Sequence, residues 1–375
     1  MDLGPSSRRL ALRRLGLIGG LALAPGMSVL AGTGARAEAA DAAGWRMPDE
    51  AERHAATWMS FGPSEDVWGR ALLRPVREHL AGIARAIAAF EPVRLFAREE
   101  DVALARRLCG AGVEVLAQPV DDLWMRDTGP VFVRDRRGRM AGVDFNFNGW
   151  GGKQVHAHDA EVAAAVADEV GVTRLESALV LEGGGIEVDG QGTAIITESC
   201  VLNANRNPGV GKAEAEQELR RLLGIEKVIW LPGIAGKDIT DGHTDFYARF
   251  TQPGTVVAGS DEDPASYDHP VTRRHLEILR GATDARGRRL KVIVLPGPGS
   301  VRPAFERPEF AAGYINFYVC NGAVIAPQFG DTRSDANARA ILREQFPGRE
   351  IVQLDIDAIA AGGGGIHCTT QQQPA

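Results

Sequence analysis

The chain has 375 residues, of which 44% are hydrophobic, and a formal net charge of −7 at pH 7. This is the composition of a soluble globular protein with one large domain or two smaller ones, and it excludes disordered and collagen-like classes. The mild acidity disfavours nonspecific binding to nucleic acid or anionic membranes and suits a small cationic ligand.

Residues 1–37 have the pattern of a twin-arginine export signal. Paired arginines precede an apolar stretch from Leu15 to about Ala31, and Ala35-Arg36-Ala37 offers a small-x-small cleavage site. Glycine and proline interrupt the apolar stretch, which disfavours a stable membrane anchor. We expect cleavage near Ala37 and a periplasmic or secreted protein in which residues 38–375 form a single domain.

Short β-like runs alternate with amphipathic helical ones, which indicates an α/β fold. The patterns predict helices at 74–90, 102–109, 160–170, 212–223 and 336–346. They predict strands at 93–97, 113–116, 178–180, 227–231 and 350–354.

A second repeat consists of a polar, often glycine-bearing turn followed by a β-run. The β-runs are expected at 131–133, 186–188, 246–250, 317–320 and 366–370. Hairpin signals follow two of them, at Asp189-Gly190-Gln191-Gly192 and at Asn321-Gly322. If these units are arranged radially, as in a propeller, each turn aims a polar residue at a shared centre.

The four cysteines, Cys109, Cys200, Cys320 and Cys368, have no disulfide-framework or zinc-site spacing, so we expect free thiols. Cys368 follows the glycine run 362–365, where ordered glycines indicate unusual backbone angles or a close approach. Such a turn could present the thiol to a cleft as a nucleophile. The alternative is a structural cysteine close to a frayed end at 371–375.

His243 is the candidate partner for such a thiol. It lies between Asp241 and Asp245, and acidic neighbours favour titration near or above neutral pH, which suits general acid/base catalysis. Metal binding is disfavoured because no second histidine follows at i+2 to i+4.

Carboxylates and one indole form a candidate cation site. Asp127 and Asp245 each stand close to a predicted strand, with Trp124 three residues before Asp127, and together they could surround a planar guanidinium. For the Trp124–Asp127 segment the alternative is an internal salt bridge. Glu182 follows the predicted strand 178–180, where a carboxylate indicates either a site role or a buried ion pair.

These residues lie in ordered motifs by which the chain resembles the agmatine deiminase and bacterial-type peptidylarginine deiminase family of guanidine-modifying enzymes. The resemblance spans roughly Trp45 to Pro374. Its motifs are Trp124–Pro130, Asn146–Lys153, Leu181–Gly184, Asn205–Pro208, Asp241–Asp245 and Gly364–Cys368.

The resemblance implies a five-bladed α/β propeller with pseudo-fivefold symmetry and hydrolysis of a guanidinium to a ureido group and ammonia through a cysteine thiouronium intermediate. It implies no metal and no organic cofactor. The implied roles are nucleophile for Cys368, general acid/base for His243, orientation of guanidinium and histidine for Glu182, substrate clamps for Asp127 and Asp245, and a wall along the alkyl arm for Trp124.

Two positions depart from the family pattern. Agmatine-specific members place adjacent acidic residues shortly before the histidine, whereas here Ile239 follows Asp238, and Gly365 stands where asparagine is frequent. We rank agmatine first as the small cationic guanidino substrate. The alternatives are a peptidylarginine deiminase, an amidinotransferase and a non-enzymatic guanidine-binding protein, and a homo-oligomer is possible.

Overall fold

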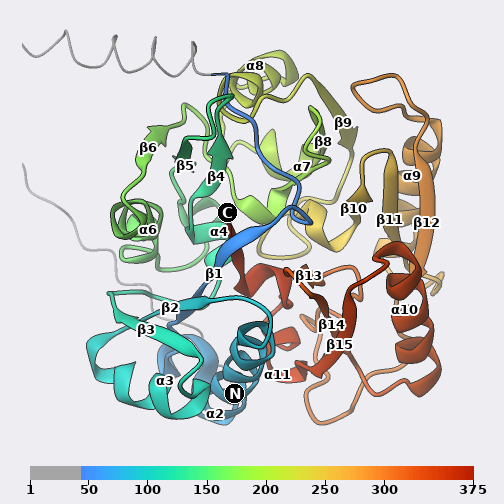
Figure 1. The fold of residues 1–375 in the computed structure, drawn as a ribbon. Helices are drawn as coiled ribbons and strands as arrows, with labels where there is room; N and C mark the ends of the chain where they lie inside the picture. Colours follow the sequence, from blue (N-terminus) through green and yellow to red (C-terminus); the bar gives the residue numbers. More distant parts are fainter. Residues whose placement is uncertain (1–43) are drawn as a thin grey trace, which may run out of the picture. The chain divides into compact units, whose positions relative to one another are not determined.

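The computed structural model describes residues 44–375, which lie within one compact unit, Ala39–Ala375 (Figure 1). The predicted export signal, residues 1–37, lies outside the described residues. No helix from residue 44 onward combines the length and the apolar character needed to cross a bilayer.

The described residues form five separate sheets. The first contains β16 (Gln371–Pro374), β1 (His54–Phe61), β2 (Val93–Ala97) and β3 (Val113–Ala117). The next two are β4 (Val131–Arg134), β5 (Met140–Asp144) and β6 (Thr173–Glu176), then β7 (Ile186–Val188), β8 (Thr193–Thr197) and β9 (Lys227–Leu231). The last two are β10 (Ala248–Gln252), β11 (Thr255–Ser260) and β12 (Lys291–Pro296), then β13 (Tyr318–Val319), β14 (Ala323–Gln328) and β15 (Glu350–Asp355).

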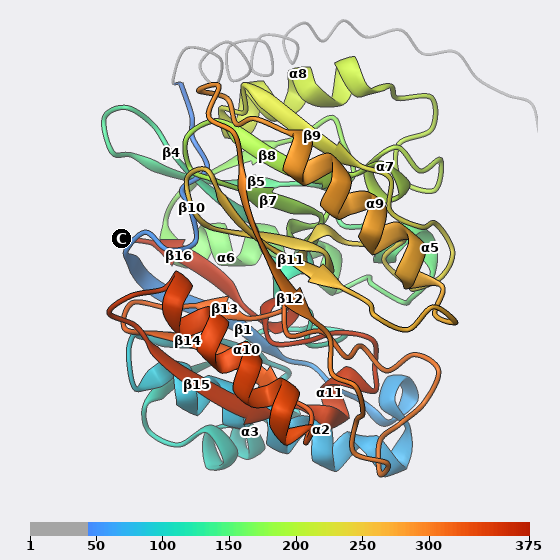
Figure 2. The same ribbon diagram turned by 90° about the vertical axis from the view of Figure 1, so that its right-hand side faces the viewer.

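Every sheet repeats one pairing pattern. An antiparallel pair is followed by a parallel strand, and the first sheet adds β3 in parallel. Parallel neighbours need a long crossover, usually a helix. The crossovers contain α2 (Glu65–Ala88), α3 (Val102–Cys109), α6 (Val162–Val170), α7 (Glu198–Val201), α8 (Lys212–Leu223), α9 (Asp268–Gly281) and α10 (Thr332–Gln345). Figure 2 shows α9 and α10 together on one side of their sheets.

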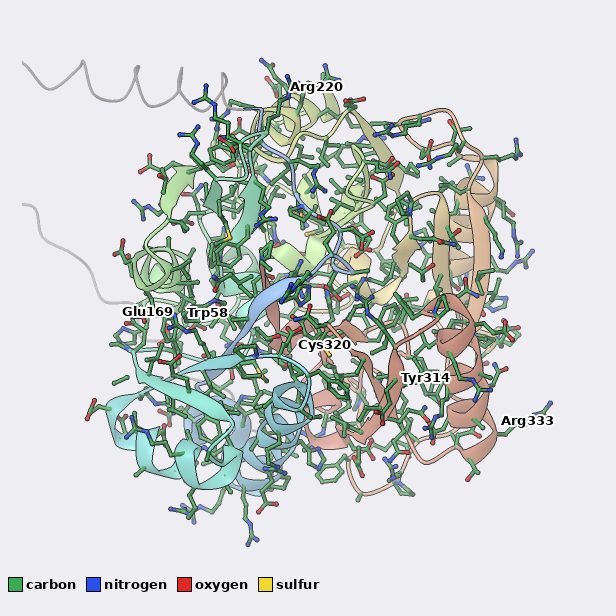
Figure 3. The ribbon with its side chains drawn as sticks, viewed as in Figure 1. Trp58, Glu169, Arg220, Tyr314, Cys320 and Arg333 are labelled. Atoms are coloured by element: carbon green, nitrogen blue, oxygen red, sulfur yellow. The ribbon has the colours of Figure 1, made fainter. Side chains whose placement is uncertain are left out.

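The α/β prediction is confirmed, and both predicted hairpins form, as β7–β8 and β13–β14. The five sheets formed by residues 44–375 are separate from one another, and their arrangement as a five-bladed propeller stays a prediction. Large side chains such as Trp58 and Tyr314 are buried, and Cys320 lies with them inside, whereas Arg220 and Arg333 lie at the periphery (Figure 3).

Most predicted helices and strands are present, with shifted ends in several cases. The helix expected at 74–90 begins at Glu65, because the chain continues through a non-helical Gly69 (φ +66°) and through Pro75. The helix expected at 336–346 begins at Thr332, where the Asp331 carboxylate accepts hydrogen bonds from the amides of Arg333 and Ser334 at the helix start.

The strand predicted at 178–180 is wrong. Its backbone groups bond to side chains instead of a neighbouring strand: the Ala178 amide donates to Glu218 (2.8 Å), and Val180 exchanges bonds with the Asn207 amide (2.8 and 2.9 Å). Leu179 is nevertheless buried, which explains the apolar pattern.

The C-terminal predictions, a strand at 366–370 and a frayed end at 371–375, are both wrong. A short 3-10 turn, η5 (His367–Thr369), precedes β16, which pairs antiparallel with β1. The glutamines of β16 are held individually, since Gln372 accepts from Arg126 (2.7 Å) and Gln373 accepts from Trp58 (2.9 Å). The strand therefore fixes the end of the segment that carries Cys368.

Candidate active site

The predicted site residues lie in equivalent places of four of the five sheets. Each sheet has a short turn just before the strand at its antiparallel edge. These turns are α4 (Met125–Thr128) before β4, η3 (Gly183–Gly185) before β7, η4 (Thr244–Phe246) before β10, residues 313–317 before β13, and η5 before β16. Asp127, Asp245, Asn316 and Cys368 lie within these turns, and Glu182 and His243 immediately precede η3 and η4.

The glycine run before Cys368 is ordered by close approach. A Cβ on Gly362 would overlap the Trp68 ring, and one on Gly364 would overlap the Trp124 ring. Gly365 faces the Asn316 side chain as closely, which leaves no room for a side chain where the family often has asparagine. Only Gly363 needs a left-handed backbone, with φ +89°.

The Cys368 thiol lies between an amide and a carboxylate. The Asn316 Nδ2 group donates to the Cys368 sulfur at 3.2 Å, and the sulfur is 3.6 Å from Asp245 Oδ2. Burial, together with Asp245 and Asp127, raises the pKa of the Cys368 thiol well above its usual value. The free protein therefore holds this sulfur as a neutral thiol at neutral pH.

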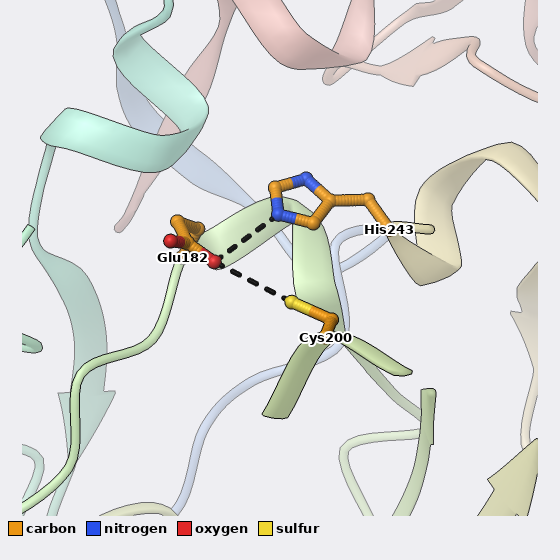
Figure 4. Close-up of side chains that lie close together, drawn as sticks. All are labelled: Glu182, Cys200 and His243. Atoms are coloured by element: carbon orange, nitrogen blue, oxygen red, sulfur yellow. Dashed lines mark hydrogen bonds and ion pairs between the residues drawn. The ribbon is translucent and has the colours of Figure 1, made fainter. Parts of the chain in front are cut away.

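His243 lies against Glu182 (Figure 4). Its Nε2 is 3.2 Å from Glu182 Oε2, which also accepts the Cys200 thiol at 3.5 Å. Arg206 Nε donates to both Glu182 oxygens at 2.7 and 3.0 Å. Burial opposes protonation of His243, but Asp127, Cys200 and Glu182 outweigh it and hold its pKa well above the usual value.

The two halves of the site meet at Gly184. A Cβ placed there would lie 2.7 Å from His243 Nδ1, 2.9 Å from Asp127 Oδ1 and 3.1 Å from Asp245 Oδ2. Cys368 contacts that same Asp245 oxygen. His243, both predicted clamps and the thiol therefore converge, although they come from the turns before strands of three different sheets.

The two clamp carboxylates differ in their partners. Asp127 accepts bonds from the Trp150 indole (2.9 Å) and the Gly184 amide (3.1 Å), and burial raises its pKa to about 6. Asp245 Oδ2 accepts from His367, whereas the buried Asp245 Oδ1 has no hydrogen-bond partner among residues 44–375. An unpaired buried acceptor is costly, which marks Asp245 Oδ1 as a contact point for a ligand donor.

Trp124 closes the site beside the glycine run. Its indole donates to Asp122 Oδ2 at 3.0 Å, and the Trp68 indole donates to the other oxygen of the same carboxylate at 2.7 Å. The two rings lie 5.9 Å apart in a tilted arrangement. Asp122 thus fixes both indoles that fill the space over Gly362 and Gly364.

All six predicted site residues are buried, and the most exposed of them, Trp124, is 7% exposed. Two surface cavities, of about 920 and 730 Å³, are lined by other residues. Burial at this level excludes bulk water and strengthens the attraction of the carboxylates for a cation.

Glu182, Cys200 and His243 are also the one group among the described residues whose donor atoms lie close enough together to hold a metal ion. Both Glu182 oxygens already bond the buried Arg206 guanidinium, whose positive charge opposes a second cation. The donor set therefore fits a hydrogen-bonded acid/base cluster better than a metal centre.

Sequence reasoning did not select Asn316, Cys200 or Arg206. Asn316 stands in the fourth repeated turn, so the repeat itself could have indicated it. Arg206 lies in the quoted Asn205–Pro208 motif, where it could have been paired with Glu182. Cys200 lies in the short helix α7 and carries no local signal.

The departure at Ile239 is visible in the structure. Ile239 is half-buried against the core cluster that includes Trp124. The Lys153 ammonium donates to the Ile239 carbonyl (2.9 Å) and to Asp241 Oδ2 (2.6 Å). Asp238 is exposed and bonds Thr240 within its own turn.

Comparison with known proteins identifies the family. The family model for Porphyromonas-type peptidyl-arginine deiminases matches residues 46–374. The chain belongs to this family. A relative from Streptomyces coelicolor is 46% identical over 338 residues, covering 88% of this chain and 99% of the relative.

This chain is also similar to family members that are named agmatine deiminases. The agmatine deiminase of Pseudomonas aeruginosa is 40% identical over 355 residues, covering 88% of this chain and 96% of that protein. The solved agmatine deiminase of Enterococcus faecalis superposes with a TM-score of 0.82 at 34% identity, covering 88% of this chain and 96% of that one. The sequence-based family assignment is therefore confirmed.

Proposed function

We propose that the protein is a deiminase, a hydrolase of C–N bonds, that converts agmatine and water to N-carbamoylputrescine and ammonia. The observation that carries this proposal is the convergence of the Cys368 thiol, the His243 imidazole and two buried carboxylates, one with the unpaired oxygen Asp245 Oδ1. The agmatine deiminase names of its relatives support the substrate.

In the binding step, Asp127 and Asp245 clamp the guanidinium, and Trp124 lines the alkyl arm. Asp245 Oδ1, which has no protein donor among the described residues, accepts a hydrogen bond from a guanidinium N–H. The positive charge beside Cys368 stabilises the thiolate and lowers the pKa of the thiol, so the thiol proton leaves to solvent as substrate binds.

In the first chemical step, the Cys368 thiolate adds to the guanidinium carbon. The protonated His243 then gives its proton to the departing nitrogen, and the C–N bond breaks. Ammonia departs, and the amidine remains bound to Cys368 as a covalent thiouronium. Glu182, fixed by Arg206, holds His243 in its protonated form before this transfer.

In the second step, the now neutral His243 takes a proton from water, and the hydroxide adds to the thiouronium carbon. The C–S bond then breaks, the thiolate is restored and the ureido product forms. The hydroxyl proton lost in this collapse is taken up by the released ammonia, and His243 is again protonated.

The test is a colorimetric ureido assay with agmatine, free arginine and arginine-containing peptides. We expect ureido product and ammonia from agmatine without an added amine. Product from peptides alone would indicate a peptidylarginine deiminase, and turnover only with an acceptor amine would indicate an amidinotransferase. Binding of agmatine without any turnover would indicate a guanidine-binding protein.

We also propose that the five sheets are the blades of a pseudo-fivefold propeller within a single domain of residues 38–375. The repeated pairing pattern and the five equivalent turns at the site support this arrangement. An experimental structure with five blades around the site would agree with it, and sheets stacked in layers would contradict it.

For location and assembly, we propose that residues 1–37 direct Tat export, that the protein acts in the periplasm or outside the cell, and that it can form a homo-oligomer. Cell fractionation with N-terminal sequencing tests the first point, and a cytosolic chain retaining its arginine pairs would contradict it. Sedimentation velocity tests the proposed homo-oligomer.

A further inference from the structure

His367, the residue immediately before Cys368, has contacts that the proposed reaction does not use. Its Nδ1 is 2.7 Å from Asp245 Oδ2, and its Nε2 is 2.8 Å from Glu50 Oε2. The ring is buried, with 2% of the residue exposed. Each contact joins a ring nitrogen to a carboxylate oxygen, so the ring bridges two carboxylates. Burial, with Arg126 and Arg249, lowers the pKa of His367 and favours a ring with a single proton, and a proton on Nδ1 donates to Asp245.

The Glu50 end of this bridge is fixed by buried cations. Glu50 pairs with Arg126 (3.1 Å) and Arg249 (2.9 Å), and Arg249 is held in turn by Glu187 at 2.7 Å. Truncating such a buried network is costly, so its members hold one geometry. His367 transmits that fixed position to Asp245.

The Asp245 end of the bridge determines which oxygen is left for substrate. His367 and Cys368 both contact Oδ2, while Oδ1 is buried and has no protein partner in the described chain. A carboxylate held through one oxygen keeps the other at a fixed angle. His367 also helps to hold the nucleophile. Its backbone amide donates to Asn316 Oδ1 (2.9 Å), and Asn316 in turn donates to the Cys368 sulfur.

We propose that His367 is a positioning residue that holds Asp245 through its Nδ1 hydrogen bond, turning Asp245 Oδ1 toward the guanidinium of the substrate. This inference rests on the proposed function for the identity of the substrate. The two ring nitrogens then have different roles: Nδ1 orients Asp245 for substrate binding, and Nε2 links the ring to the buried Glu50 network.

Two matched variants separate these roles. In His367→Asn the amide nitrogen occupies the place of Nδ1 and can still donate to Asp245. In His367→Gln the amide nitrogen occupies the place of Nε2 and can donate only to Glu50. We expect His367→Gln to raise KM for agmatine by about 10- to 100-fold, the loss of a bond to a charged group, and His367→Asn to keep KM within about threefold.

The readouts are KM and kcat for agmatine together with thermal unfolding of each variant. A purely structural role predicts the reverse order, because His367→Asn breaks the link to Glu50. Equal KM values, or a larger KM in His367→Asn, would overturn the inference. If the wild type makes no ureido product, the proposed function fails, and the same comparison is made by calorimetric binding of agmatine in the Cys368→Ala background.

A second measurement covers the case in which the variants do not fold. In Cys368→Ala labelled with ¹⁵N-histidine, the His367 Nδ1–H resonance is identified by its loss in Asp245→Asn. We expect agmatine to shift this resonance, because the guanidinium binds the other oxygen of the same carboxylate. A ring N–H signal that is indifferent to agmatine at saturation would contradict the proposal.

Discussion

Cys368 and Cys200 have similar surroundings and differ in one respect that decides their roles. Both thiols are buried beside a carboxylate oxygen, at 3.6 Å for Cys368 and 3.5 Å for Cys200, and burial raises the pKa of both. The carboxylate beside Cys200 is fully partnered by Arg206 and His243, whereas the one beside Cys368 keeps a free oxygen. The feature that distinguishes the proposed nucleophile is therefore the unsatisfied carboxylate oxygen beside it, because burial is common to both thiols.

The sharpest way to break this comparison is to remove each thiol separately. We expect Cys368→Ala to lower kcat for agmatine by roughly 10⁴-fold or more, because the covalent step is lost. We expect Cys200→Ala to stay within about tenfold, because Arg206 still holds Glu182. The ureido assay measures both, and a larger loss in Cys200→Ala would reverse the assignment.

The next effect tests the base that Cys200 and Glu182 surround. We expect His243→Gln to lower kcat by about 10²- to 10⁴-fold, the usual contribution of a positioned general acid/base. The change in KM should be smaller, since the clamps remain. His158→Gln, at an exposed position, is the control. Equal losses in the two variants would mean that His243 has no special part in the reaction.

The sequence selected residues that the structure brings together, although it mispredicted some of the elements around them. The repeated turn brought Asp127, Glu182, His243 and Cys368 into one hypothesis, because a turn preceding a strand is a local pattern. Asn316 was passed over in the same repeat because an amide has no acid or base signature. The partners of Cys200 and the bridge through His367 are tertiary contacts that leave no trace in residue spacing.

Two of the three wrong elements share one physical cause. The segment 178–180 and the tail 371–375 are both stabilised by side-chain hydrogen bonds to distant residues. Examples are the contacts of Val180 with Asn207 and of Gln372 with Arg126. Apolar periodicity does not encode such bonds, and a polar tail looks frayed until its partners are known.

The glycine run that carries Cys368 has no counterpart beside Cys200, which gives a stability test. In Gly364→Ala the new Cβ would overlap the Trp124 ring, and we expect a destabilisation of about 1–3 kcal/mol together with a lower kcat. Gly281→Ala, where no heavy atom lies within 4 Å of the added Cβ, is the control. Denaturant unfolding compares the two variants, and equal stabilities would mean that the run is not held by close packing.

The smallest effect concerns pH and the two halves of the site together. Burial raises the pKa of Asp127 to about 6, so its negative charge is present above that pH and is lost as the pH falls through it. We expect kcat/KM for agmatine to fall about tenfold per pH unit below this value, because the protonated clamp no longer attracts the guanidinium.

On the alkaline side, the raised pKa of His243 keeps the imidazolium through neutral pH, and kcat/KM should fall only as that proton is lost. Asp127→Asn separates the two limbs of the profile. It should lower kcat/KM at neutral pH and abolish the acid limb near 6. It should also move the alkaline limb to lower pH, because the charge of Asp127 makes the largest contribution among the neighbours that raise the pKa of His243. An unchanged alkaline limb would mean that the Cys368 half of the site, and not His243, sets it.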